Sequence, residues 1–256
     1  MSTAKLIVKS ASIISIATLC SRLLGFARDI VIARLFGVYI YAQAFVVAFK
    51  IPNLLRDLLA EGAANAAFVP VFSEYITRHN KEELWELANV VLNLLLVILS
   101  IITLLGIVFS PLIVRIIAPG FISDTAKLEA TVRLTRWIFP YILLISLAAY
   151  SMGILNSFKH FSVPAFAPCL LNISIILCAL LFGEDTLGLA TGVLLGGVMQ
   201  LAIQIPVLYK KGFRLNYFLR RFRHPAARTI GILMLPRILS SAIYQLNNFV
   251  DSIFGS

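Results

Sequence analysis

The chain has 256 residues, of which 60% are hydrophobic and only 13% are charged, and its formal net charge is +10. Because soluble domains carry about twice this share of charged residues, the composition excludes an ordinary soluble globular domain and is typical of a membrane protein. The sequence contains no GxSxG, Walker or dinucleotide motif and no Cys/His cluster, so it indicates no enzyme, no cofactor and no metal site.

Hydropathy predicts an all-α, polytopic membrane bundle of about seven spans, because apolar runs long enough to cross a hydrocarbon core of about 30 Å recur along the whole chain. The predicted spans are residues 10–36, 41–77, 87–117, 130–157, 165–183, 187–209 and 229–254. The first two are longer than one crossing requires. Gly25 and Pro52 are the points at which these long helices could bend or break.

The first span carries charges where leucines are expected. Its stretch CSRLLGFARDIVIARLFG, residues 20–37, contains Arg22, Arg28 and Asp29. A charged side chain at the centre of a spanning helix costs on the order of 2.5–3.5 kcal/mol on insertion scales, so this group needs a compensating role. On an ideal helix Arg22 and Asp29 share one face, whereas Arg28 points about a third of a turn away.

The second span carries a polar stripe. In KIPNLLRDLLAEGAANAAF, residues 50–68, the side chains of Lys50, Asn53, Asp57 and Glu61 follow one another at helical spacing, and Arg56 flanks them. Such a stripe cannot face lipid tails and is too charged for a dry core, so it predicts a water-filled cavity between helices.

Two interpretations of these charges remain open. They could neutralise one another as structural ion pairs, for example Arg28 with Asp57 or Lys50 with Glu61. Alternatively, the arginines bind an anionic ligand, because a guanidinium grips phosphate through two parallel hydrogen bonds and stays charged at any relevant pH. A diphosphate fits that chemistry.

The connection KKGFRLNYFLRRFRHPAART, residues 210–229, is the most basic stretch of the chain. Aromatic and aliphatic side chains alternate there with arginines, which predicts an amphipathic cytoplasmic linker over residues 213–228 that rests on anionic lipid. Nucleic-acid binding is the weaker alternative in so apolar a chain. The linker separates a bundle over residues 1–212 from a last span over 229–256. Because Lys and Arg gather on one side of the predicted spans, the N-terminus is predicted to be cytoplasmic.

Long stretches of the sequence resemble a known family. SRLLGFARDIVIARLFG at 21–37, AFVVAFKIPNLLRDLLAEGAANAAFVPVFSEY at 44–75, FPYILLISLAAYSMGILNSFKHFSVPAFAPCLLNIS at 139–174 and GGVMQLAIQIP at 196–206 are similar to the MurJ (MviN) lipid II flippases. These belong to the multidrug/oligosaccharidyl-lipid/polysaccharide exporter superfamily. The resemblance covers essentially all of the chain but only the N-terminal half of the family's usual length.

The resemblance implies the N-terminal lobe of a two-lobe alternating-access transporter, in a multi-pass protein of the bacterial inner membrane, with a C-terminal lobe as its expected partner. The implied cargo is lipid II, the undecaprenyl-diphosphate-linked peptidoglycan precursor for cell-wall synthesis. By resemblance, Arg22, Arg28 and Arg56, beside Asp29 and Asn53, would hold the diphosphate.

Two features depart from the family's pattern. Gln43 stands where members commonly carry an acidic residue, which leaves a gate or ion-coupling role there unassigned. The second departure is the C-terminal lobe, which is absent here together with the cavity arginine that the family places in its eighth span; Arg237 does not match that arginine.

Two other functions remain as alternatives. The chain could belong to an exporter of drugs or of another polyprenyl-linked oligosaccharide; a drug exporter would favour acids or aromatics in its cavity. It could also be a truncated assembly partner that does not itself transport.

Overall fold

The computed structural model describes residues 3–37, 40–56, 66–183, 185–215 and 221–254, and these residues form a helical bundle without strands. A π-helical turn over residues 66–68 leads into the third helix. The elements are α1 (Thr3–Phe36), α2 (Ile40–Arg56), α3 (Val69–Arg78), α4 (Lys81–Val108), α5 (Ser110–Ile117), the 3₁₀ turn η2 (Pro119–Phe121), α6 (Thr125–Ile138), α7 (Tyr141–Ser157), α8 (Ser162–Phe182), α9 (Thr186–Ala202), α10 (Ile205–Lys211) and α11 (Pro225–Phe254).

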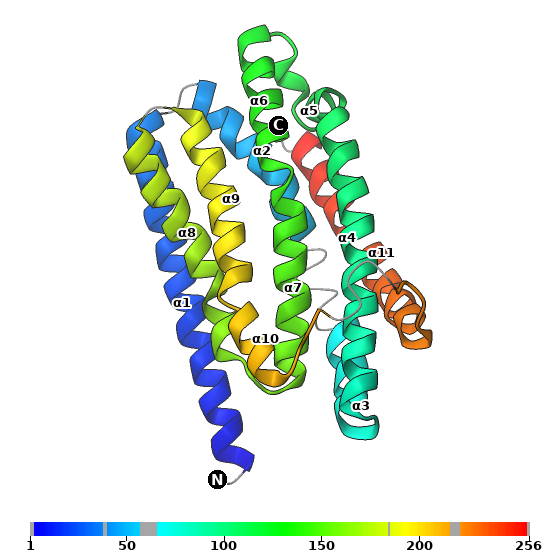
Figure 1. The fold of residues 1–256 in the computed structure, drawn as a ribbon. Helices are drawn as coiled ribbons and strands as arrows, with labels where there is room; N and C mark the ends of the chain where they lie inside the picture. Colours follow the sequence, from blue (N-terminus) through cyan, green and yellow to red (C-terminus); the bar gives the residue numbers. More distant parts are fainter. Residues whose placement is uncertain (1–2, 38–39, 57–65, 184, 216–220, 255–256) are drawn as a thin grey trace.

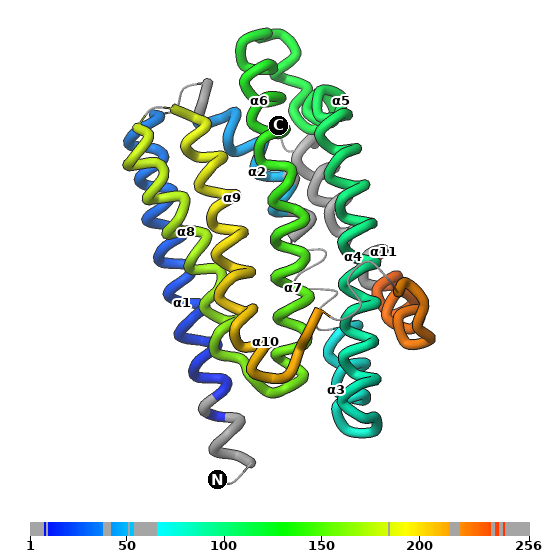
Figure 2. Tube along the Cα trace, viewed as in Figure 1, coloured from blue at the N-terminus to red at the C-terminus, as the bar shows by residue number. Residues whose placement is uncertain are grey.

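The long helices α1, α4, α7, α8 and α9 lie roughly along one direction, as crossing a bilayer requires, and α2 runs obliquely to them (Figure 1). α8 packs between α1 and α9, α7 follows α9, and α4 lies on the far side of α7. Figure 2 shows the start of α11 beside α4.

Five helical segments among the described residues are long and apolar enough to cross a membrane. They are Ser10–Phe36, Lys81–Val108, Thr125–Ser157, Ser162–Phe182 and Thr186–Lys211. These correspond to the first, third, fourth, fifth and sixth predicted spans. The predicted second span is occupied by α2 and α3, with residues 57–65 between them outside the described part, and the predicted seventh lies within α11.

Neither Gly25 nor Pro52 interrupts its helix: α1 continues past Gly25 to Phe36, and α2 passes through Pro52 to Arg56. At Gly25 the reason is packing. A Cβ placed there would make only an ordinary contact, 3.7 Å from Nδ2 of Asn172, so α8 lies directly against α1 at this position. A helix within a bilayer also has no water to replace its backbone hydrogen bonds, which favours continuity.

Capping side chains fix where several helices begin. The carboxylate of Asp124 accepts a hydrogen bond from the Lys127 backbone N–H at the start of α6, and Asp185 does the same for Leu187 at the start of α9. Asn80 caps α4 by accepting from the Glu83 N–H at 2.8 Å. These polar residues stand next to apolar runs in the sequence, so the sequence itself determines where these helices begin.

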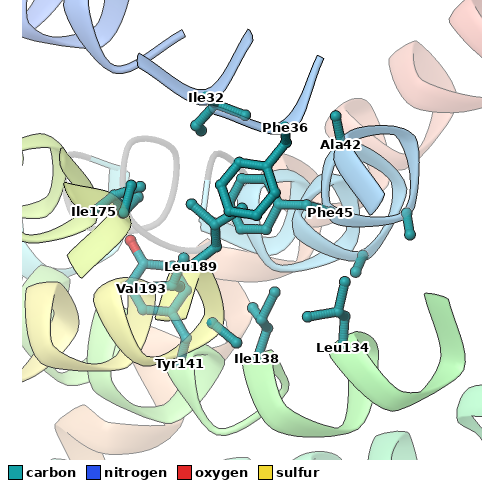
Figure 3. Close-up of a cluster of buried hydrophobic side chains, with 14 of the residues drawn as sticks. Ile32, Phe36, Ala42, Phe45, Leu134, Ile138, Tyr141, Ile175, Leu189 and Val193 are labelled. Atoms are coloured by element: carbon teal, nitrogen blue, oxygen red, sulfur yellow. The ribbon is translucent and has the colours of Figure 1, made fainter. Parts of the chain in front are cut away.

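One hydrophobic cluster joins six helices close to the polar residues of α1 and α2 (Figure 3). Phe36 and Phe45 point into it from α1 and α2, and Tyr141 from α7. The other labelled residues are Ile32 from α1, Ala42 from α2, Leu134 and Ile138 from α6, Ile175 from α8, and Leu189 and Val193 from α9. This cluster fixes the relative positions of α1, α2 and α8, which carry the candidate site.

Candidate functional site

Arg28 is the centre of the polar cluster on α1. Its Nε and Nη2 groups donate to Oδ1 of Asp29 at 3.0 and 2.8 Å, and its Nη1 donates to Oδ1 of Asn172 on α8 at 3.1 Å. The guanidinium also lies 5.9 Å from the centre of the Phe49 ring on α2. Three helices therefore hold one arginine in place.

Asn172 fixes this arginine from the neighbouring helix. Its Nδ2 donates to the backbone carbonyl of Ser21 at 3.1 Å, while its Oδ1 accepts from Arg28. Asn172 is buried. Because both ends of its amide are bonded to α1, it cannot turn without breaking a hydrogen bond, and it orients the guanidinium.

A cavity of about 640 Å³ opens beside this cluster, between α1, α2 and α8. Of the predicted site residues, Arg28, Asp29, Lys50 and Asn53 line it, together with Asn172. The side chain of Arg28 is 21% exposed and that of Asp29 is 64% exposed. The polar residues of the first two predicted spans are thus brought together around a space of ligand-binding size.

Arg22 lies in an adjoining cavity rather than in the same one. This second cavity, of about 350 Å³, is also lined by Gln200 and Gln204, and it shares Ser21 and Pro168 with the first. The two spaces are therefore neighbours along α1, with Arg22 in one and Arg28 in the other.

The remaining predicted site residues cannot be placed. Asp57 and Glu61 lie outside the described residues, and the side chain of Arg56, the last residue of α2, is outside them as well. The suggested pairs Arg28 with Asp57 and Lys50 with Glu61 therefore remain predictions. The side chain of Arg237 is likewise not described.

Sequence reasoning missed Asn172 and the buried amides of Gln200 and Gln204. Each is a polar side chain in an otherwise apolar span, where an amide without a partner would be costly. That cost is the signal that could have identified them.

Gln43, the position that departs from the family's pattern, has a partner on another helix. Its Oε1 accepts a hydrogen bond from Nζ of Lys127 on α6, and that ammonium lies 3.9 Å from the centre of the Phe121 ring. The neutral amide therefore joins α2 to the start of α6.

The described parts of the predicted linker follow α4. The Asn89 side chain donates to the carbonyl of Arg214 at 2.9 Å and the Asn93 side chain to that of Arg221 at 2.8 Å, while the Arg221 side chain pairs with Glu86. Of the described residues of 213–228, those from Pro225 onward belong to α11, and the polar contacts hold Arg214 and Arg221 against α4.

Comparison with known proteins identifies the family. A family model described as "Lipid II flippase MurJ" matches residues 32–256. A probable lipid II flippase MurJ of Buchnera aphidicola from Acyrthosiphon pisum is 40% identical over 95% of this chain and 48% of its own length. The lipid II flippase MurJ of Burkholderia cenocepacia is 38% identical over 93% of this chain and 48% of its own length.

Solved structures agree on the fold. A lipid II flippase MurJ in an inward closed conformation superposes with a TM-score of 0.74 at 28% identity, over 93% of this chain and 49% of that one. A transporter of the same superfamily from Pyrococcus furiosus gives 0.75 at 21% identity, which shows the fold alone. The chain spans about half the length of the curated relatives it matches. It belongs to the lipid II flippase MurJ family and has the fold of one transporter lobe.

Proposed function

We propose that this chain acts as one lobe of a lipid II flippase, in which Arg28 and its neighbours bind the diphosphate of the lipid-linked peptidoglycan precursor. The observation that carries the proposal is the cavity of about 640 Å³ with Arg28 fixed in its wall by Asp29 and Asn172. The names of the two curated relatives described above, both lipid II flippases, support the choice of cargo.

The local charge suits an anion. Among the described residues that line the larger cavity, Arg28 and Lys50 are cations and Asp29 is the one carboxylate. Arg22 adds a further cation in the adjoining space. Guanidinium groups bind phosphate oxygens in a bidentate manner, so the arrangement favours a diphosphate over a neutral or cationic cargo. We propose that Arg56 joins this set, as its position at the end of α2 suggests.

Transport would require the lobe to move relative to a second lobe, so that the headgroup is exposed first to one side of the membrane and then to the other. The relatives are about twice as long as this chain, which supports a second lobe as the partner. The headgroup crosses without covalent change; an ion gradient or the membrane potential would have to stabilise the two states differently.

We propose a cytoplasmic N-terminus in the bacterial inner membrane. The helix ends at the same end of the bundle as the N-terminus carry Arg78, Lys81, Lys159, Lys210 and Lys211, at or next to them in the sequence (Figure 1). Short cytoplasmic connections favour such basic residues. Labelling a Lys159→Cys variant in a cysteine-free background with a membrane-impermeant maleimide tests this: labelling in intact spheroplasts would contradict it.

We also retain the proposal that the linker contacts anionic lipid. Arg221 pairs with Glu86, but the side chains of Phe222, Arg223 and Arg228 are exposed and combine apolar surface with positive charge. That combination favours a membrane surface rich in anionic lipid.

The central experiment is complementation of flippase-depleted cells by this chain joined to the C-terminal lobe of a relative. Arg28→Ala should abolish rescue, and Arg28→Lys should rescue poorly because it keeps the charge but loses the planar fork. Arg34→Ala is the matched control, since this exposed arginine on the same helix lines neither cavity. Full rescue by Arg28→Ala at equal membrane levels would refute the proposed role.

A further inference from the structure

A second arginine cluster lies away from the candidate site, in a groove between α5 and α6. The groove has a volume of about 660 Å³, and its walls include Arg115, Arg133, Arg136, Glu129 and Trp137. α5 and α6 lie side by side at the end of the bundle opposite the N-terminus (Figure 1). Neither the cargo nor the proposed movement of the lobe accounts for this cluster.

The groove carries excess positive charge. Its three arginines face one carboxylate, that of Glu129. Across the described residues, none of the three arginines takes part in an ion pair. The groove therefore has a net charge of +2 and attracts an anion.

One arginine of the cluster is held in place. Nε of Arg136 donates to the hydroxyl oxygen of Ser110 at 3.0 Å, and that hydroxyl in turn donates to the carbonyl of Ile107 at 2.9 Å. Ser110 is fully buried. The hydrogen bond uses Nε and leaves the two terminal nitrogens of this exposed guanidinium free to donate to a phosphate in the groove.

The surface around the groove indicates lipid as the source of the anion. Leu112 and Ile116 on α5 are 55% and 59% exposed, and Trp137 on α6 is 50% exposed. Apolar side chains this exposed, in a protein with several membrane spans, face the bilayer. Tryptophan is enriched in the headgroup region of membrane proteins, and Trp137, in the first half of the span Thr125–Ser157, lines the same groove as the three arginines. The arginines therefore lie where phospholipid headgroups are.

We propose that the groove between α5 and α6 binds the phosphate headgroup of an anionic phospholipid, with Arg115, Arg133 and Arg136 as its ligands and Trp137 against the upper acyl chain. The site is separate from the diphosphate cavity and does not depend on the proposed function. Bound lipid would hold α5 and α6 together at this end of the lobe.

Trp137 provides the measurement, because the chain has only two tryptophans. Trp85 lies on α4 among aromatic side chains, so Trp85→Phe leaves Trp137 as the sole tryptophan. The variant is reconstituted into phosphatidylcholine vesicles that contain brominated phosphatidylglycerol or, at the same mole fraction, brominated phosphatidylcholine. Bromine quenches tryptophan fluorescence only at close range, so quenching reports which lipid occupies the groove.

We expect brominated phosphatidylglycerol to be preferred roughly thirtyfold, as two net juxtamembrane charges predict. Replacing Arg115 and Arg133 by glutamine leaves one cation facing Glu129 and should bring the preference close to one. Arg34→Gln is the matched control, because this exposed arginine lies at the same end of the bundle outside the groove and should leave the preference unchanged.

Three results would overturn the proposal. They are equal quenching by the two lipids, a preference that survives the double replacement, and loss of phosphatidylglycerol quenching when inorganic phosphate is added, which would mean that the groove takes a free anion. If Trp85→Phe does not fold, the wild-type chain is compared with Trp137→Phe, and the difference in quenching reports on Trp137 alone.

Discussion

Replacing Asn172 by alanine tests whether the amide between α1 and α8 positions Arg28. The change removes two hydrogen bonds, both 3.1 Å long: one from Arg28 and one to the carbonyl of Ser21. Hydrogen bonds between membrane helices contribute about 0.6 kcal/mol on average and about 1.7 at most. The bond to the largely buried guanidinium belongs near the upper part of that range, about 1 kcal/mol after allowing for its exposure.

The sum predicts that Asn172→Ala lowers the free energy of unfolding by about 1.6 kcal/mol. In an Arg28→Ala background only the bond to Ser21 remains to be lost, so the same change should cost about 0.6 kcal/mol. The difference, about 1 kcal/mol, is the coupling energy between the two residues. Denaturant titration in mixed detergent micelles measures all four variants of the cycle.

The affinity for a diphosphate should depend on the same interaction between Asn172 and Arg28. If Asn172 orients Arg28 toward the diphosphate, Asn172→Ala weakens binding of farnesyl diphosphate about fivefold, the equivalent of about 1 kcal/mol. Ser174→Ala is the matched control: its buried hydroxyl donates to the carbonyl of Gly192 at 2.8 Å, away from the cavity. That variant should lose stability without coupling to Arg28. A coupling energy of zero for Asn172 would refute the positioning argument.

Two further outcomes follow from packing and from titration. Gly196→Ala should destabilise the protein by about 1–3 kcal/mol, because the added Cβ would lie 2.8 Å from the Cα of Leu171 and force α8 and α9 apart. Gly231→Ala is the control: no atom lies within 4 Å of its added Cβ, so this change should be neutral or stabilising. Thermal unfolding distinguishes the two variants. His224 packs edge-on against Tyr75 of α3, with ring centres 5.7 Å apart. Burial lowers the pKa of His224 below its ordinary 6.5, so the stability that this packing contributes is complete above pH 6.5 and is lost as the pH falls through the lowered value. Hydrogen-exchange protection of residues 221–228 should therefore fall on acidification in the wild type but not in His224→Gln, and equal pH dependence in both would contradict this.

Much of the fold could be predicted from hydropathy, because a bilayer imposes one length scale on every span. Five of the predicted spans coincide with helices that are long and apolar enough to cross. Hydropathy did not predict the local course of the backbone. Gly25 and Pro52 have a low intrinsic helix preference, yet both lie inside continuous helices, since packing against other helices decides the backbone there.

The candidate site could be predicted in kind but not in geometry. The cost of charges within a span identified Arg28, Asp29, Lys50 and Asn53, and these four residues line one cavity. Helical spacing alone paired Arg22 with Asp29 and could not show that Arg22 faces a second space. Spacing within one helix carries no information about the neighbouring helix.

The two ligands of the guanidinium bear differently on anion binding. Asp29 is 64% exposed and adjacent in sequence, so its carboxylate can turn toward water when a diphosphate arrives, at little cost in desolvation. Asn172 is neutral and fixed to α1 at both ends of its amide, so it orients Arg28 without cancelling its charge. A buried carboxylate in its place would hold the arginine permanently. Asn172→Asp should therefore weaken diphosphate binding more than Asn172→Ala does, and the same titration with farnesyl diphosphate would contradict this reasoning if the aspartate variant bound more tightly than the alanine variant.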